Sequence, residues 1–409
     1  MAGPAMNVAV REFFASEPGY VLLLFVLFVV PRFLQRYRLP TAITSFALGA
    51  VASLGFTLYT YDATLKLLST FGIVALFLFA GLEVDTDALK RGAKIITQHL
   101  AIRLAMLTMG TVGVAWWLGL GTRPAALVTL ALITPSAGFI LDSLGRLGLE
   151  PEEQFWVKSK VIATEILALS VLFVALQSSS VSRLVLASFA LAAIIGILPW
   201  AFRVFAQRVA PYAPKSEFAF LIMMALLCAY ATRLLGVYYL VGAFIVGLAA
   251  RRFRDQLPAV ASEQMLHAIE VFASFFAPFY FFAAGTSLHR DDFSLYSLAL
   301  GMVFLAIAVP LRLLSVTGHR GLVLKEDQKR SVRIAAPMLP TLVFTLVIAD
   351  ILRERFDLSN EIFGALIIYT VCTTLIPGFL FGSPPPRYDS PELPPRPGGN
   401  EMVPPPLAD

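Results

Sequence analysis

Long apolar stretches follow one another along almost the whole chain, and short polar or basic segments separate them. A helix that crosses a lipid bilayer needs roughly 20 predominantly apolar residues. Stretches of this kind predict about thirteen helices, at residues 18–35, 40–56, 64–82, 94–119, 124–146, 154–178, 182–206, 217–235, 237–252, 266–287, 294–318, 330–352 and 360–382. The pattern predicts an all-α polytopic membrane protein whose membrane domain occupies residues 18–382.

The composition supports this interpretation. Of the 409 residues, 58% are hydrophobic and 14% are charged, whereas a soluble domain is about half apolar and a quarter charged. The net charge of +5 comes from short basic clusters between apolar stretches, so it does not indicate nucleic-acid binding. Cys228 and Cys372 both lie inside apolar stretches, which predicts packing residues rather than a disulfide or a metal site.

The basic residues concentrate in alternate loops. Clusters such as Arg251 and Arg252 follow the odd-numbered helices, whereas the even-numbered loops carry mostly single basic residues such as Arg183. The positive-inside rule places the clustered loops in the cytoplasm. The sequence therefore predicts a protein of the inner (plasma) membrane, with residues 1–17 outside and the C-terminus in the cytoplasm.

Beyond the last apolar stretch, residues 383–409 are rich in proline and glycine. Such a composition predicts a disordered cytoplasmic tail, and a passive tail is favoured over a partner-binding segment. The chain contains no phosphate-binding glycine loop, HExxH or GxSxG motif. The sequence thus predicts that the protein is not an enzyme and has no cofactor and no tightly bound metal.

Two of the predicted helices, the fifth and the twelfth, are interrupted by prolines. The residues at the two interruptions are Thr134, Pro135, Ser136, Pro337, Pro340 and Thr341. Proline removes an N–H and frees a carbonyl about one turn earlier, and such interruptions in corresponding helices indicate a transporter binding site. The two helices are seven apart, an odd number, which predicts inverted repeats. Two ordinary proline kinks would give the same local pattern.

Two charges lie inside apolar stretches. Glu165 follows the start of its predicted helix by about twelve residues, which is ~18 Å along a helix and near the membrane midplane. A carboxylate at this depth is costly and marks a functional-site hypothesis, with a structural pair to an arginine as the alternative. Arg312 either balances Glu165 or extends to the membrane surface.

Three segments in this order resemble the monovalent cation:proton antiporter-2 family. They are residues 76–91 with Gly-Leu-Glu, residues 234–252 with Gly-Ala-Phe, and residues 277–288 with Phe-Phe and a following glycine. The resemblance covers roughly residues 18–382. It implies the sodium/proton antiporter-like fold, with two interrupted helices that cross, a homodimer and elevator-like alternating access.

By this resemblance, Glu165 takes the position of the ion-carrying carboxylate, and Thr164 stands where members have aspartate or asparagine. The helices with Pro135 and Pro340 correspond to the family's two unwound helices. Arg312 corresponds to the region that carries a basic residue opposite the carboxylates. A neutral threonine in the first position leaves one obvious proton carrier, which predicts electroneutral exchange.

We therefore expect exchange of a monovalent cation, Na⁺ or K⁺, for H⁺, with Glu165 shared by the two ions. Backbone and hydroxyl oxygens at the crossing, including Thr134 and Ser136, would complete the cation's ligands. A partner-gated potassium efflux pore and a non-transporting sensor or assembly subunit are the alternatives, and a sodium-coupled symporter is more distant. Nucleotide-dependent regulation would need a separate cytosolic subunit.

Overall fold

The computed structural model describes residues 12–14, 16–59, 62–145, 147–213, 216–236, 238–253 and 262–381, so the predicted tail at 383–409 lies outside it. Within these ranges every regular element is a helix. The α-helices are α2 (Glu17–Leu34), α3 (Thr41–Phe56), α4 (Ala63–Leu82), α5 (Thr86–Arg91), α6 (Ala93–Leu118), α7 (Thr122–Ile133), α8 (Ala137–Leu144), α9 (Pro151–Gln177), α10 (Val181–Val204), α11 (Glu217–Leu234), α12 (Tyr239–Arg252), α13 (Glu263–Thr286), α14 (Leu295–Val323), α15 (Gln328–Ala335), α16 (Leu342–Phe356) and α17 (Asn360–Phe381). Shorter turns are η1 (Gln35–Tyr37), η2 (Phe205–Val209), η4 (Arg290–Asp292) and η5 (Ala336–Met338).

The helices confirm the predicted polytopic membrane protein. In the described part, ten helices are long and apolar enough to cross a membrane, and a pair of helices, Gln328–Met338 and Leu342–Phe356, makes an eleventh with a 44° bend. Two further predicted stretches form the shorter helices α3 and α12, of 16 and 14 residues. Each predicted stretch thus contains a helix or a helix pair, whereas the number of thirteen membrane spans stays a prediction.

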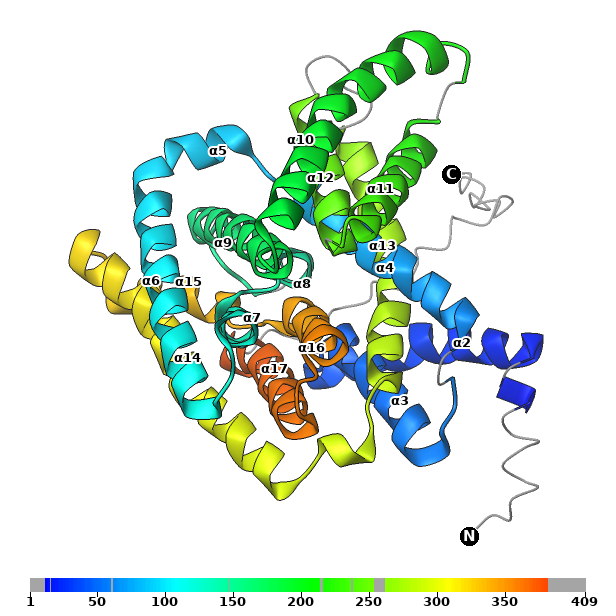
Figure 1. The fold of residues 1–409 in the computed structure, drawn as a ribbon. Coiled ribbons are helices and arrows are strands. Elements are labelled where there is room, and N and C mark those ends of the chain that lie inside the picture. The colour runs from blue at the N-terminus through cyan, green and yellow to red at the C-terminus, as the bar shows by residue number, and fades with distance from the viewer. Residues whose placement is uncertain are drawn as a thin grey trace, which may run out of the picture.

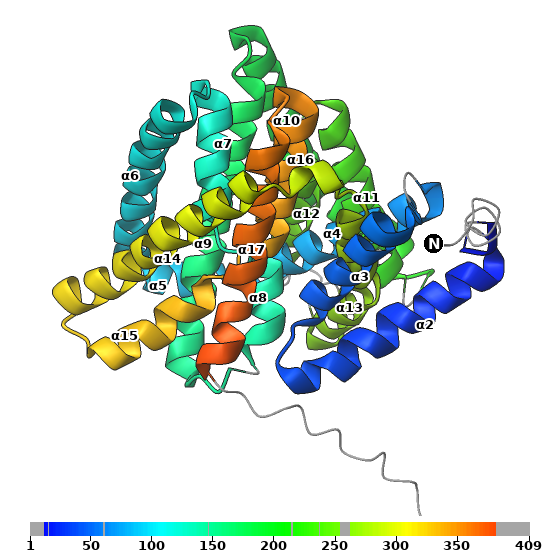
Figure 2. The ribbon, with the colours of Figure 1, turned by 90° about the horizontal axis from the view of Figure 1, so that it is seen from below.

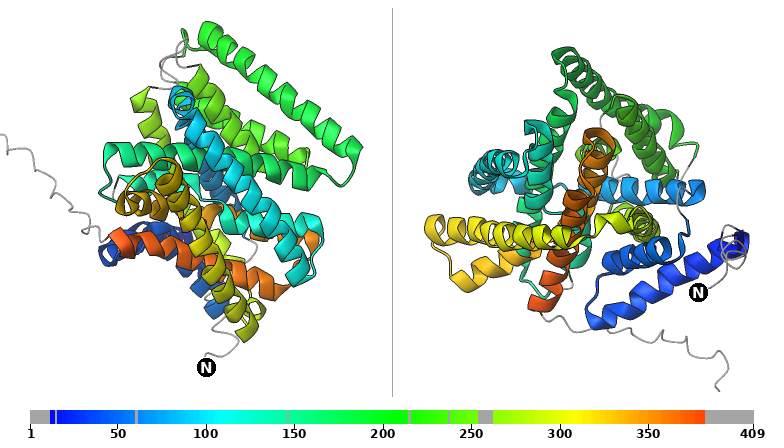
Figure 3. Two further views of the ribbon diagram at one scale, coloured as in Figure 1. Left: turned by 90° about the vertical axis from the view of Figure 1, so that its left-hand side faces the viewer. Right: turned by 60° about the horizontal axis from the view of Figure 1, so that its bottom comes forward.

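The helices form two groups that lie side by side in Figures 1 and 2. We call α6–α9 with α14–α17 the crossing group, because it contains both interrupted helices. We call α2–α4 with α11–α13 the flanking group. Helix α10 lies at the edge of the molecule in both views of Figure 3, and only 11% of its most apolar stretch is buried. Its exposed apolar side chains are suited to contact with lipid.

The flanking group is held by very close helix contacts. A Cβ atom added to Gly49 on α3 would lie 2.0 Å from the Phe282 carbonyl oxygen of α13. Reciprocally, a Cβ on Gly285 of α13 would lie 2.1 Å from the Phe46 carbonyl oxygen of α3. Glycine at both positions lets the two backbones touch, which is a common basis of helix association in membranes.

Candidate functional site

The first interruption separates α7 from α8. Helix α7 ends at Ile133, and Thr134 and Ser136 adopt extended backbone angles before α8 begins at Ala137. Pro135 has no N–H, so the Ala131 carbonyl one turn earlier loses its helical donor. In place of that donor, the Thr345 hydroxyl of α16 donates to the Ala131 oxygen at 2.8 Å.

The second interruption separates α15 and η5 from α16. Here the side chain of Arg312 on α14 replaces the missing helical donors: Nη2 donates to the Met338 carbonyl oxygen at 2.5 Å, and Nη1 donates to that of Leu339 at 2.8 Å. Arg312 is only 2% exposed. Its charge therefore lies at the carbonyl end of the half-helix, where a cation interacts favourably with the helix dipole.

The two interruptions meet through exchanged hydrogen bonds. The Ser136 N–H donates to the Pro340 carbonyl oxygen at 2.9 Å. In a continuous helix, that oxygen would accept from the Phe344 N–H, which instead donates to Ser136 Oγ at 3.1 Å. Two helices far apart in sequence thus satisfy each other's freed backbone groups, and the predicted crossing of the interrupted helices is confirmed.

A residue that the sequence analysis missed joins both half-helix ends. The Tyr369 hydroxyl on α17 donates to the Leu132 carbonyl oxygen at 2.6 Å and accepts from Arg312 Nη1 at 3.1 Å. Leu132 would otherwise bond to the Ser136 N–H, which is used at the crossing. The only sequence signal was a single tyrosine within an apolar stretch.

Glu165 lies on α9 beside the start of α8. Its Oε2 accepts a hydrogen bond from the Ala137 N–H at 2.9 Å, and the residue is only 1% exposed. The N-terminus of a helix carries partial positive charge and unpaired N–H groups, which favour a carboxylate. Among the ion pairs of the described residues none includes Glu165, and Arg312 donates to carbonyl and hydroxyl oxygens.

Thr164, the residue before Glu165, faces α6. Its hydroxyl donates to the Lys160 carbonyl oxygen at 2.7 Å and lies 3.1 Å from His99 Nε2. Thr134 Oγ1, at the first interruption, is buried and has no hydrogen-bond partner within the described ranges. The structure thus brings Thr134, Ser136 and Glu165 to the crossing.

Thr341 at the second interruption has a different environment. Its hydroxyl lies 2.9 Å from Thr370 Oγ1 and 3.4 Å from Thr373 Oγ1, both on α17. These contacts link the start of α16 to α17 rather than to the buried carboxylate. Pro337 lies inside η5, and Pro340 supplies the carbonyl that bonds to Ser136.

A cavity of about 310 Å³ lies between the crossing and flanking groups. Gly138 and Phe139, which follow Ala137 in the first turn of α8, line it from the crossing group, and α2, α3, α4 and α13 line it from the other side. Arg32 and Glu270 also line it, and Arg32 lies in the last turn of α2, beside the loop whose basic residues predict a cytoplasmic position. The cavity therefore connects the first turn of α8 with the predicted cytoplasmic side.

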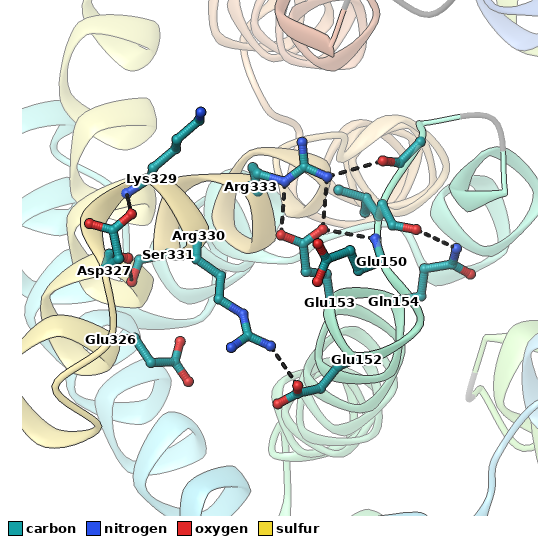
Figure 4. Close-up of polar contacts among 12 residues, drawn as sticks. Glu150, Glu152, Glu153, Gln154, Glu326, Asp327, Lys329, Arg330, Ser331 and Arg333 are labelled. Carbon is teal, nitrogen blue, oxygen red and sulfur yellow. Dashed lines mark hydrogen bonds and ion pairs between the residues drawn. The ribbon is translucent and has the colours of Figure 1, made fainter.

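Ion pairs at this side fasten the broken helix to the helix that carries Glu165. Arg333 of α15 lies against Glu153 at the start of α9 (Figure 4). The Nε–Oε1 and Nη2–Oε2 distances of this pair are 2.8 and 2.9 Å. Arg330 and Glu152 form a second pair at 2.6 Å. Paired N–H donors on one carboxylate give a directional contact, so α9 and α15 are held in one orientation.

On the opposite side, arginines of α16 bridge the two helix groups. Arg353 pairs with Asp292, which is fully buried in η4. Arg353 Nη1 also donates to the Ser287 carbonyl oxygen at 3.2 Å. Arg355 donates to the Gly236 carbonyl oxygen, between α11 and α12, at 2.9 Å. The groups are therefore joined at the predicted outer side and separated by a cavity at the predicted cytoplasmic side.

Interrupted helices that cross beside a buried carboxylate are the architecture of secondary transporters. The family described as "Sodium/hydrogen exchanger, transmembrane" matches residues 22–384, and the chain belongs to this family. The predicted relationship to cation:proton antiporters is thereby confirmed.

Several known proteins are similar to this chain. A probable Na⁺/H⁺ antiporter 3 of Methanocaldococcus jannaschii is 28% identical over 382 residues, which cover 87% of this chain and 93% of the relative. Cation/H⁺ antiporter 18 of Arabidopsis thaliana is 25% identical over 76% of this chain and 40% of its own length. These relatives are transporters and not enzymes.

The solved structures give the same fold. The sodium proton antiporter MjNhaP1 of Methanocaldococcus jannaschii, at pH 8, superposes with a TM-score of 0.67 at 12% identity, over 92% of this chain and 97% of its own. An electron-microscopy structure of the same protein gives a TM-score of 0.65 at 16% identity, over 88% of this chain and 94% of its own. The sodium/proton antiporter-like fold predicted from the sequence is confirmed.

Proposed function

We propose that this protein is a secondary antiporter that exchanges a monovalent cation, Na⁺ or K⁺, for H⁺, with Glu165 as the shared carboxylate. The observation that carries the proposal is the position of Glu165, which is buried at the N-terminus of α8 where the interrupted helices cross. The names of the relatives, which are Na⁺/H⁺ and cation/H⁺ antiporters, support the reaction type.

The crossing offers hydroxyl and carbonyl oxygens as ligands beside the Glu165 carboxylate. Thr134 Oγ1 has no partner in the described structure and lies two residues before Ser136, so it is available to a cation at the crossing. Oxygen atoms of carboxylate, hydroxyl and carbonyl groups are the ligands that hard cations prefer. Binding of the cation or of a proton would neutralise the same carboxylate, so one ion excludes the other.

This competition couples the two fluxes. A bare carboxylate in a buried site is costly, so Glu165 would cross between the two sides only with a proton or a cation bound. One carboxylate then exchanges one proton for one cation, and we propose electroneutral exchange. Alternating access would take place by movement of the crossing group against the flanking group, with the cavity at Gly138 as the cytoplasmic route.

We also propose a homodimer in the inner (plasma) membrane, with the N-terminus outside and the C-terminus in the cytoplasm. The family resemblance supports the dimer, and the basic loops support the orientation. Cross-linking in membranes tests the first, and a C-terminal reporter that is active only in the cytoplasm tests the second.

Reconstitution into liposomes with an imposed pH gradient and a pH-sensitive dye tests the function. Addition of Na⁺ or K⁺ should collapse the gradient in the wild type and not in Glu165→Gln. Glu217→Gln, which changes a glutamate in the first turn of α11, is the matched control and should behave as wild type. Exchange by Glu165→Gln at the wild-type rate would contradict the assignment of the carrier.

The same measurement separates the alternative functions. Cation flux that is independent of the pH gradient would indicate a pore. No flux with any cation, from protein shown to be folded, would favour a sensor or assembly subunit. A membrane-potential dye records the stoichiometry: no potential should develop during one-for-one exchange.

A further inference from the structure

His99 is a buried histidine of α6 that contacts the residue next to the proposed carrier. Its side chain is fully buried, and Nε2 lies 3.1 Å from Thr164 Oγ1. Thr164 is 3% exposed. The contact joins α6 to α9 at the level of Glu165, and nothing in the exchange reaction described above uses it.

The hydrogen-bond inventory fixes the direction of this contact. A threonine hydroxyl has one proton and two lone pairs. The Thr164 proton is directed to the Lys160 carbonyl oxygen at 2.7 Å, so the hydroxyl accepts from His99. The imidazole must therefore carry a proton on Nε2. Its Nδ1 atom has no hydrogen-bond partner among the described residues.

The two bonds leave the Thr164 oxygen with a single lone pair. The Thr164 proton is donated to the Lys160 carbonyl oxygen, and one lone pair accepts from His99 Nε2. The hydroxyl therefore cannot rotate without the loss of a buried hydrogen bond. It can therefore offer at most one oxygen ligand, in one direction. A ligand fixed in this way favours the cation whose radius matches the distance from it to the other ligands.

We propose that His99 is a positioning residue that acts through the Thr164 hydroxyl to set the cation affinity and selectivity of the exchange site. The inference rests on the proposed function, because it takes the cation to bind beside Glu165 and the Thr164 hydroxyl oxygen to be one of its ligands. His99 does not carry the transported ion. Its removal should weaken cation binding and change the preference among Li⁺, Na⁺ and K⁺, whereas the maximal rate should stay close to that of the wild type.

Four variants test this role in the liposome assay: His99→Leu, His99→Gln, Thr164→Val and the double variant His99→Leu/Thr164→Val. Loss of the hydrogen bond in His99→Leu should raise the KM for the preferred cation by about tenfold. His99→Gln retains an N–H donor and should restore most of the affinity. The double variant should be no worse than the poorer single variant, because both remove one interaction.

His319→Leu is the matched control. His319 is also buried, and its Nε2 lies 3.0 Å from Gln98 Oε1, on the residue before His99. If loss of any buried histidine in this region changed the ion preference, His319→Leu would change it as much as His99→Leu does. The proposal instead expects His319→Leu to have the ion preference of the wild type. Additive effects of His99→Leu and Thr164→Val, or an unchanged ion preference in His99→Leu, would overturn the proposal.

A spectroscopic measurement keeps the inference testable if the protein proves not to exchange ions. ¹⁵N spectra of histidine-labelled protein should show His99 with its proton on Nε2, assigned by loss of the signal in His99→Gln. Thr164→Val should shift this signal, and saturating Na⁺ or K⁺ should shift it in the wild type only. A His99 signal that shifts neither in Thr164→Val nor on addition of cation would contradict the proposal. Absence of exchange alone would contradict only the proposed function.

Discussion

The Ser136 N–H donates to the Pro340 carbonyl oxygen across 2.9 Å, although the two residues belong to different interrupted helices. The Ser136 hydroxyl oxygen accepts in return from the Phe344 N–H at 3.1 Å. A single serine thus satisfies both a free carbonyl and a free amide of the opposite helix. In lipid this matters because no water is available to replace a missing partner.

Ser136→Ala should therefore destabilise the protein by about 1–3 kcal/mol, because the buried Phe344 N–H loses its acceptor. Thermal unfolding of the purified protein in detergent measures the change. Ser143→Ala on α8 is the control, since among the described residues the Ser143 hydroxyl donates to the Phe139 and Ile140 carbonyl oxygens of its own helix. Equal unfolding temperatures for the two variants would contradict this account of the crossing.

Tyr369→Phe removes a hydroxyl and keeps the ring. The Leu132 carbonyl would lose its donor, and Arg312 would lose an acceptor. We expect a loss of about 1–3 kcal/mol in stability and slower exchange, because both half-helix ends are released. Tyr280→Phe is a matched control, since the buried Tyr280 hydroxyl has no hydrogen-bond partner in the described part of the chain. Comparable losses in both variants would show that the hydroxyl bridge is unimportant.

Asp292→Ala should be much more damaging than Asp291→Ala. Asp292 is fully buried and pairs with Arg353, whereas its neighbour Asp291 is exposed. Removal of one partner of a buried ion pair leaves an uncompensated charge and costs about 3–5 kcal/mol. Unfolding temperatures of the two variants give the comparison. If Asp291→Ala were as destabilising as Asp292→Ala, the buried pair would not be what joins η4 to α16.

Two adjacent glutamates at the start of α9 should also differ. The Glu153 side chain is 3% exposed and binds Arg333 through two hydrogen bonds, whereas the Glu152 side chain is 63% exposed and binds Arg330. Glu153→Gln should lower the stability by about 1–3 kcal/mol. Glu152→Gln should have little effect, because exposed ion pairs contribute little. Unfolding temperatures of both variants in low and high salt test this difference, since salt should screen the exposed Glu152–Arg330 pair more than the buried Glu153–Arg333 pair.

Much of the fold was predictable because each membrane helix is specified locally. A helix satisfies its own backbone hydrogen bonds, so an apolar stretch of sufficient length indicates a helix without knowledge of its neighbours. Pro135 and Pro340 marked the two interruptions for the same reason, since a missing N–H is a property of the residue. The isolated carboxylate of Glu165 was visible because of its depth within an apolar stretch.

The partners of these residues were not predictable. Arg312 was expected either to balance Glu165 or to extend to the surface, and in the structure it donates to the Met338 and Leu339 carbonyl oxygens. Tyr369 gave no signal, because a tyrosine in an apolar helix is compatible with many environments. Such contacts depend on how each helix is rotated and placed against its neighbours, which lie between 26 residues away, for Arg312 and Met338, and 237 residues away, for Tyr369 and Leu132.

The sequence by itself determined the membrane helices, the two interruptions and the buried carboxylate, because these follow from local hydrogen bonding and from the cost of charge in lipid. Only the tertiary structure decided which groups replace the backbone partners that the prolines remove. It placed the Ala137 N–H against Glu165 and His99 against Thr164. Those pairings arise from the packing of separate helices, where each freed polar group must find a donor or acceptor on another chain segment.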